Sequence, residues 1–174
     1  SKGQKMTFKK APPFTVIKDT REQEGYTFVK YKTRYHSCDG MVTKKLDTGD
    51  YSLLGFEDKI CIERKASTAE LATNLGQDKH RFMAEIERMK PFPHKFIILE
   101  FSMEDLMVFP EESGIPEEKW KSIKVTNKYM MKMLMEFGLY DNIHVLFCGN
   151  RKNAKLTTTS ILKRVNEMYT IGRK

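Results

Sequence analysis

The chain has 174 residues, of which 40% are hydrophobic and 31% are charged, and its mean hydropathy is −0.55. These values fit one soluble domain with a buried core, and they exclude fibrous, collagen-like and mucin-like chains. The longest apolar stretches, such as Phe96–Leu99, have only four residues, so we expect no membrane span, and we expect no secretory signal before the first strand. Three cysteines without zinc-type spacing indicate a reducing compartment.

The net charge of +8 is unevenly distributed along the chain. Residues 1–10 carry +4, residues 151–174 carry +6 and residues 11–150 carry −2. Seven acidic residues, without a single Lys or Arg, fall between Glu100 and Glu118. The basic ends are compatible with a polyanionic partner, although a basic surface can also serve solubility alone. If the ends are functional, we expect them to contact backbone phosphates without reading sequence.

The first part of the chain predicts a basic arm followed by two strands. Residues 1–13 are polar and rich in lysine, which favours a flexible N-terminal arm, and 14–174 form the single domain. Runs of β-branched and aromatic residues predict strands over 14–17 and 41–46. Between them, residues 25–40 show no clear burial pattern and are expected to be extended chain or loop.

A hairpin and a helix are predicted next. Residues 51–54 and 59–65 read as two strands around a turn, and side-chain alternation places Glu63 and Lys65 on the same face. Ser67 or Thr68 is positioned to cap a helix that runs to Met89, with an interruption expected at Gly76.

The second half of the chain alternates strands and helices. We expect a buried strand over 95–101, an acidic loop over 104–118, a helix from Thr126 that ends at Gly138, a strand over 143–147 and a closing helix over 156–169. A hairpin followed by helix, strand, helix, strand and helix is an α/β pattern. It predicts a mixed sheet with helices on both faces.

Four short pieces of sequence place acidic residues after the first strand, at the entry to the hairpin, on its return strand and in the helix behind it. They are Asp19-Thr-Arg21-Glu22, Gly49-Asp50-Tyr51, Glu63-Arg64-Lys65 and Glu70. Crowded carboxylates raise one another's pKa unless a cation neutralises them. Mg²⁺ takes one or two protein carboxylates together with waters and phosphate oxygens, so it is the expected occupant.

The motifs allow a role to be predicted for each side chain. Asp50 and Glu63 would be metal ligands, and Lys65 would orient a water held by the metal and help to deprotonate it for attack on phosphorus. Asp19 and Glu22 would bind a second metal or hold the waters of the first. The expected contacts to DNA phosphates are Arg21, Arg64 and, on the polar side of the first helix, Arg81. Taken singly, these charged residues could equally be surface ion pairs, worth about 0–1 kcal/mol each.

The ordered set resembles the nuclease domain of the XPF-type excision-repair family, within the restriction-endonuclease-like PD-(D/E)XK superfamily. D-x-R-E, G-D-Y and I-E-R-K carry the resemblance over residues 14–101, and the order of elements extends it to 14–170. It implies a restriction-endonuclease-like α/β fold and a DNA endonuclease that uses Mg²⁺, with Mn²⁺ as a substitute. The active-site positions of the family fall on Asp19, Glu22, Asp50, Glu63, Arg64 and Lys65.

Two departures limit what the resemblance implies. The family usually has an aspartate four residues after the lysine, whereas this chain has Ala69 there and Glu70 next. Helix-hairpin-helix modules are also not expected after Thr170, which favours a compact stand-alone form of prokaryotic or phage type. We expect a homodimer, branched or flapped DNA as the substrate, and a possible loading partner. The expected location is cytoplasmic, or nuclear if the source is eukaryotic.

Two alternative functions remain open at this point. One is a catalytically silent DNA-binding or scaffolding subunit of the same fold, against which the intact Asp50, Glu63 and Lys65 argue. The other is a phosphoryl hydrolase that acts on RNA or on free nucleotides.

Overall fold

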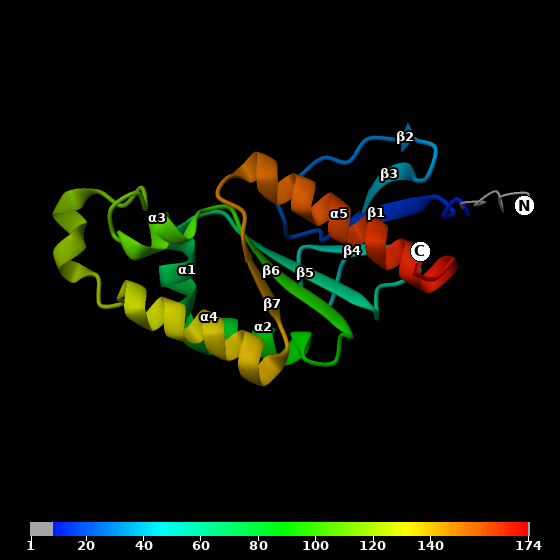
Figure 1. The fold of residues 1–174 in the computed structure, drawn as a ribbon. Coiled ribbons are helices and arrows are strands. Elements are labelled where there is room, and N and C mark those ends of the chain that lie inside the picture. Colours follow the sequence, from blue (N-terminus) through cyan, green and yellow to red (C-terminus); the bar gives the residue numbers. More distant parts are fainter. Residues whose placement is uncertain (1–8, 174) are drawn as a thin grey trace, which may run out of the picture.

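The computed structural model describes residues 9–173 and contains one seven-stranded mixed sheet (Figure 1). In sheet order the strands are β2 (Tyr31–Lys32), β3 (Ser37–Thr43), β1 (Phe14–Lys18), β4 (Tyr51–Leu53), β5 (Ile60–Lys65), β6 (His94–Leu99) and β7 (His144–Phe147). The helices are α1 (Thr68–Leu75), α2 (Lys79–Met89), α3 (Met103–Met107), the 3₁₀ helix η1 (Glu117–Ser122), α4 (Asn127–Asp141) and α5 (Arg151–Thr170). This architecture confirms the predicted α/β class.

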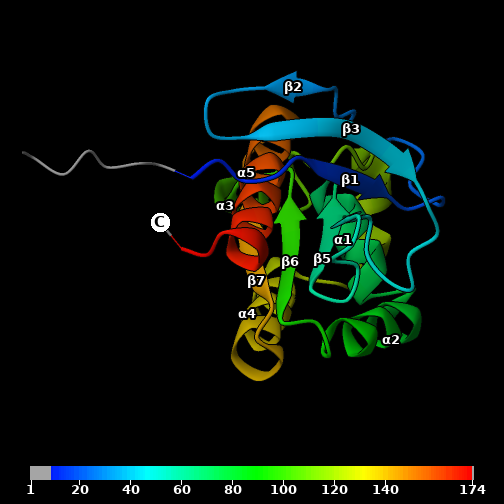
Figure 2. The ribbon, with the colours of Figure 1, turned by 90° about the vertical axis from the view of Figure 1, so that its right-hand side faces the viewer.

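Helices cover both faces of the sheet, as the alternation of elements predicted. On one face, α1 to α4 pack over a core that includes Cys61, Ile97 and Leu99. On the other face, α5 packs over β1, β4 and β6, so that Leu162 and Ile98 belong to the same buried cluster (Figure 2). Buried β6 lies between the two layers, and its parallel pairing with β5 and β7 follows from the helical connections that join these strands.

The predicted hairpin is confirmed and it determines the faces of β5. β4 and β5 are antiparallel, with Tyr51 opposite Ile62. Ile60 and Ile62 join the core under α5, whereas Cys61 joins the core under α1 and α2. Glu63 and Lys65 share the face of Cys61 because side chains alternate along a strand. The interruption expected at Gly76 is also present, since α1 ends there and α2 starts at Lys79.

Three sequence-based boundaries were wrong. The second long strand is 37–43 rather than 41–46. Gly40, at φ +94°, interrupts the alternation of buried and exposed side chains, so the start of this strand could not be recognised in the sequence. α4 continues through Gly138 and ends at Asn142, which adopts the left-handed conformation at φ 56°. The 104–118 stretch is not only loop: Ser102 and Asp105 cap each other's backbone and start α3.

The chain before β1 is partly anchored. Residues 1–8 of the predicted arm lie outside the described part of the chain. Ala11 is buried, and the side-chain amide of Asn166 on α5 donates to the carbonyl of Pro12 (2.8 Å). The end of the arm therefore packs on the domain. Among residues 9–173, none of the helices combines the length and the apolar character that crossing a membrane requires.

Candidate active site

One pocket collects most of the residues that the sequence motifs singled out. Asp19, Arg21, Glu22, Asp50, Glu63 and Arg64 all line it. The sheet topology explains this, because β4 lies between β1 and β5 and is antiparallel to both. The end of β1 and the start of β4 therefore meet, and the backbone N–H of Asp19 donates to the carbonyl of Asp50 (2.8 Å).

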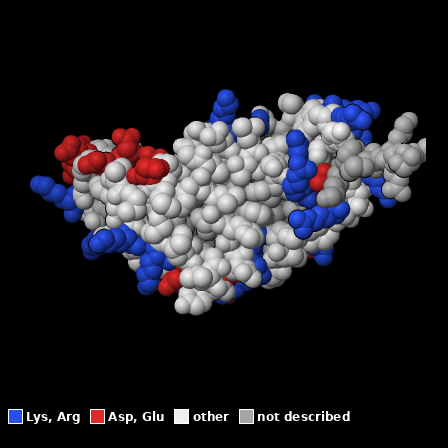
Figure 3. Space-filling view, viewed as in Figure 1, with Lys and Arg blue, Asp and Glu red and all other residues white. Residues whose placement is uncertain are grey.

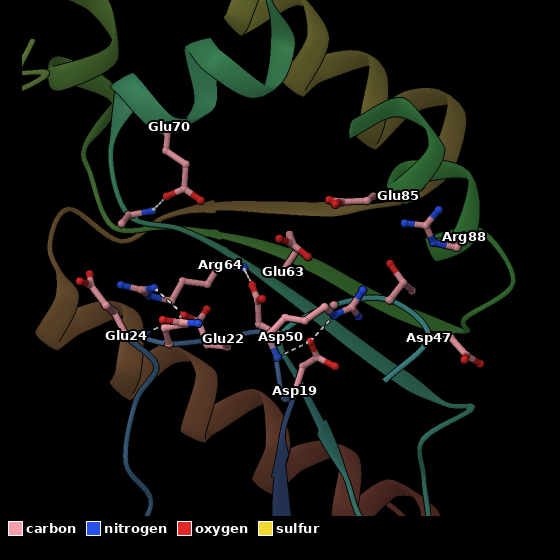
Figure 4. A pocket seen from close by; sticks show the side chains of 15 residues that line it. Asp19, Glu22, Glu24, Asp47, Asp50, Glu63, Arg64, Glu70, Glu85 and Arg88 are labelled. Carbon is pink, nitrogen blue, oxygen red and sulfur yellow. Dashed lines mark hydrogen bonds and ion pairs between the residues drawn. The ribbon is translucent and has the colours of Figure 1, made fainter. Parts of the chain in front are cut away.

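Asp50 and Glu63 form the centre of the pocket. Their carboxylates point into the same space in front of β5 (Figure 4). One oxygen of Asp50 accepts from the backbone N–H of Arg64 (2.7 Å), which holds this carboxylate beside the edge of β5. Lys65 lies behind Glu63 and does not line the pocket. Its ammonium is 3.3 Å from Glu63 Oε1 and 3.9 Å from Glu70 Oε1.

Burial and like charge dominate the electrostatics of this pair. Burial raises the pKa of Asp50 well above its usual range, the neighbouring Glu63 raises it further, and the hydrogen bond from Arg64 only partly offsets both. Burial likewise raises the pKa of Glu63 despite the nearby Lys65. Burial lowers the pKa of Lys65, but the surrounding carboxylates outweigh it and the pKa stays above its ordinary value. Lys65 is thus a cation in this structure.

Asp19 and Arg21 form the wall of the pocket that follows β1. Oδ1 of Asp19 accepts from the backbone N–H of Leu46 (2.7 Å), and Oδ2 accepts from Nε and the backbone N–H of Arg21 (2.7 and 3.1 Å). Arg21 also donates to the carbonyl of Leu46 (2.8 Å), while more than half of its side chain stays exposed. Burial raises the pKa of Asp19, but these hydrogen bonds outweigh it and the pKa lies below its usual value.

Arg64 is held by a carboxylate that the sequence motifs did not include. Its Nε and Nη2 donate to the two oxygens of Glu100 (2.6 and 3.1 Å), and its Nη1 lies 3.5 Å from Glu22. The phenol of Tyr26 also donates to Glu100. Arg64 and Glu100 are both deeply buried. The predicted phosphate contact of Arg64 stays a prediction, and in the structure its guanidinium makes an internal ion pair.

Two further pocket residues come from α2, whereas Arg81 of the same helix does not line the pocket. Glu85 and Arg88 reach in from the side opposite the sheet (Figure 4). Arg81 is exposed and pairs with Asp78 (2.9 Å). The sequence did contain a pattern that indicates Glu85 and Arg88. They lie three residues apart, so they share one side of the helix, and the apolar periodicity shows that this is the polar side. The sequence alone did not distinguish that side of the helix from a solvated surface.

The donor set fits Mg²⁺. Within residues 9–173, no group of three or more His, Cys, Asp or Glu side chains is arranged to hold a metal ion by itself. A pair of crowded carboxylates is nevertheless what Mg²⁺ uses, since it keeps several waters and accepts the remaining oxygens from a phosphate substrate. The pocket offers hard oxygen ligands, and burial together with the neighbouring Glu63 raises the pKa of Asp50, an effect that a bound cation would offset.

Comparison with known proteins places this geometry in a family. The model of the ERCC4 domain matches residues 19–160, so the chain belongs to the ERCC4 domain family. No curated protein sequence matches the chain. The match spans the pocket, strands β2 to β7 and half of α5, and it confirms the resemblance that the three motifs carried.

Two solved structures share the fold. XPF from Aeropyrum pernix has a TM-score of 0.57 at 18% identity, over 87% of this chain and 61% of that chain. XPF from Aeropyrum pernix in complex with DNA has a TM-score of 0.55 at 18% identity, over 87% of this chain and 64% of that chain. The chain therefore spans less than two thirds of the length of either. The likeness confirms the restriction-endonuclease-like α/β fold.

Proposed function

We propose that the protein is a Mg²⁺-dependent endonuclease that hydrolyses phosphodiester bonds in DNA. The observation that carries the proposal is the convergence of Asp50 and Glu63 on one pocket, with Lys65 behind them, in a chain of the ERCC4 domain family. A related structure, XPF from Aeropyrum pernix, is described in complex with DNA, which supports DNA as the substrate.

Each residue has a distinct part in this reaction. Asp50 and Glu63 would hold the metal, which when bound supplies positive charge to the phosphate and to the attacking water. Lys65, buried and cationic, would fix the orientation of Glu63 and stabilise negative charge that develops at the phosphate. Glu22 and the exposed part of Arg21 lie at the pocket wall, where they would orient waters and a phosphate oxygen. Asp19 would hold the wall itself, since both its oxygens already accept hydrogen bonds.

A cleavage assay tests the assignment. Plasmid and branched DNA would be incubated with Mg²⁺ and with wild type, Asp50→Ala or Lys65→Ala. We expect activity to fall by at least about 100-fold in each variant, in the range seen when one preorganised charge-stabilising group is removed. Lys119→Ala is the matched control, because this exposed lysine of η1 does not line the pocket. Unchanged cleavage in both site variants would refute the site, and no cleavage by wild type would favour a silent DNA-binding subunit.

Substrate competition separates DNA from RNA. Linear duplex, single-stranded DNA, flapped DNA and RNA of matched length would compete with a labelled flapped duplex. We expect flapped or branched DNA to be the strongest competitor, as the resemblance to XPF-type nucleases implies. Cleavage of RNA alone, and its loss when 2′-hydroxyls are removed, would instead support the RNA hydrolase.

We also propose that two copies associate through α4, the start of α5 and the edge strand β7. Both helices carry exposed apolar side chains, namely Met135, Leu139 and Tyr140 on α4 and Leu156 on α5. β7 is a sheet edge, and such an edge exposes unpaired backbone groups. Leu139→Lys is expected to give a monomer in sedimentation experiments. Val29→Lys changes an equally exposed apolar residue elsewhere and should leave the dimer intact. A monomeric wild type would rule out the pairing.

A further inference from the structure

A row of cations on α5 packs over a row of aromatic rings. The pairs are Arg151 over Tyr26 (5.0 Å), Lys155 over Phe28 (5.8 Å) and Lys163 over Tyr31 (5.3 Å). A cation over the face of an aromatic ring is attracted to it, so together these contacts hold the 26–31 segment against the helix. The rings attract the cations but carry no net charge. The positive charges of the row therefore remain available to an anion.

The first turns of α5 and the adjoining chain enclose a small basic pocket. Arg151, Lys152 and Lys155 line it together with residues 25–27. Among the described residues, no carboxylate lies within ion-pair distance of Lys152 or Lys155. Arg151 has one distant carboxylate, Glu100 at 3.8 Å, which already binds Arg64 through both oxygens.

This basic pocket is the immediate neighbour of the catalytic pocket. Glu22, Gln23 and Glu24 line the catalytic pocket, and the next residues, 25–27, line the basic pocket. Arg151 joins the two, because its Nη2 donates to the carbonyls of Glu24 and Gly25 (2.7 and 3.0 Å). A nucleic acid strand with one phosphate in the catalytic pocket would therefore place a neighbouring phosphate close to Arg151, Lys152 and Lys155.

The charge of α5 and of residues 25–36 is almost entirely positive. Residues 25–36 contain Lys30, Lys32 and Arg34 and no acid, and α5 contains a single acid, Glu167. Basic side chains are visible over the end of the molecule that carries α5 and β3, whereas acidic side chains gather over the opposite end, near α3 (Figure 3). Clustered Lys and Arg on one surface are the footprint of backbone phosphate recognition.

We propose that the pocket formed by Arg151, Lys152, Lys155 and residues 25–27 binds a backbone phosphate of the DNA strand that enters the catalytic pocket. The proposal rests on the proposed function for the identity of the nucleic acid. It assigns no base contact, so the site positions the strand without reading its sequence. Lys163 and the cations of residues 30–34 extend the same surface along α5.

Binding without cleavage tests the site. Lys152→Glu/Lys155→Glu would be compared with wild type in fluorescence anisotropy on a flapped DNA, without divalent metal, from 50 to 200 mM salt. Each phosphate contact contributes about 0.9 to the slope of log affinity against log salt, so two lost contacts reduce the slope by about 1.8. Over a fourfold change in salt, this slope difference changes the affinity ratio of wild type to variant by about twelvefold.

The control keeps the same change of charge at the other end of the molecule. Lys119→Glu/Lys121→Glu alters two exposed lysines of η1 and should leave the slope within about 0.3 of wild type, because no phosphate contact is lost. Arg151 stays unchanged in both variants because its hydrogen bonds hold residues 24 and 25. Thermal unfolding of each variant establishes that it is folded.

The outcomes separate this inference from the proposed function. Equal effects of the two double variants would indicate only net charge and would overturn the site, as would an unchanged slope in Lys152→Glu/Lys155→Glu. A reduced slope confined to that variant supports the site even if wild type fails to cut DNA. If wild type cuts DNA, the variant should show a raised KM and a kcat within about twofold of wild type, since no lost group touches the reacting phosphate.

Discussion

The buried ion pair between Arg64 and Glu100 makes a strong prediction about stability. Glu100 lies directly after β6, and its carboxylate binds Arg64 through both oxygens while accepting from Tyr26. The two charged side chains are only 7% and 5% exposed. Glu100→Ala would leave the guanidinium buried, with Glu22 at 3.5 Å as its remaining carboxylate. Breaking a buried pair by removing one partner costs about 3–5 kcal/mol, and the residual pairing to Glu22 favours the lower end.

Urea unfolding followed by circular dichroism measures this loss. For a domain of this size, about 3–5 kcal/mol corresponds to a fall in Tm of roughly 6–20 °C. Glu111→Ala is the matched control, because this exposed acid is expected to stay within about 0.5 kcal/mol of wild type. The double variant Glu100→Ala/Arg64→Ala should cost less than the sum of the single losses by about 1–3 kcal/mol, since the orphaned charge is then absent.

Two results would refute the reasoning. One is a loss below about 1 kcal/mol for Glu100→Ala, because the desolvation penalty of an unpaired buried charge exceeds that value. The other is an additive double variant, which would mean that the two side chains do not depend on each other. Either result would also remove the reason for regarding Arg64 as a structural member of the pocket.

Three further predictions follow from the surroundings of the pocket. Gly49→Ala should destabilise the protein by about 1–3 kcal/mol and impair cleavage, because Gly49 has φ +84° and an added Cβ would lie 2.7 Å from Cys61 Sγ. The control is Gly55→Ala, where φ is +89° but the added Cβ would meet open space. This variant should lose less stability than Gly49→Ala and should cleave DNA normally. Burial and Glu100 raise the pKa of Tyr26, so the folded state keeps a proton that the unfolded state releases, and stability should fall as pH rises above about 10. Tyr26→Phe should weaken this pH dependence of stability, measured by urea unfolding at pH 9 and pH 11. The same variant should lack one of the phenols that ionise late when absorbance at 295 nm is followed against pH. Deletion of residues 1–10 should weaken DNA binding and reduce its salt slope by a few units at most, at about 0.9 per phosphate contact, and an unaltered slope would exclude a role for the arm in binding.

Local sequence rules predicted the centre of the site. Glu63 and Lys65 had to share a face because they lie two residues apart on a strand, and the antiparallel pairing of β4 with β5 had to bring Asp50 close to β5. The strands themselves could be predicted because their apolar runs are short and regular. Where a single residue breaks the pattern, as Gly40 does in β3, the boundary was wrong.

The residues that hold the site in place could not be predicted in the same way. Glu100 is 36 residues from Arg64, and in the sequence it opens a run of seven acids that looks like a solvated surface. Its position depends on the parallel register of β5 and β6, which places Lys65 opposite Leu99 and so brings residue 100 beside the end of β5. Nothing in the local pattern encodes that register, because both faces of β6 are apolar.

The same register explains how the two pockets are coupled. Glu100 binds Arg64, whose backbone N–H holds Asp50 in the catalytic pocket, and it lies 3.8 Å from Arg151 in the basic pocket. The ring of Tyr26 lies near both guanidinium groups, at 5.4 and 5.0 Å. Because a buried charge network is stable only when all its members are paired, a change at Glu100 should disturb both pockets at once. Loss of salt-dependent DNA binding together with cleavage in Glu100→Ala, measured at a temperature where it remains folded, would demonstrate that coupling, and loss of cleavage alone would exclude it.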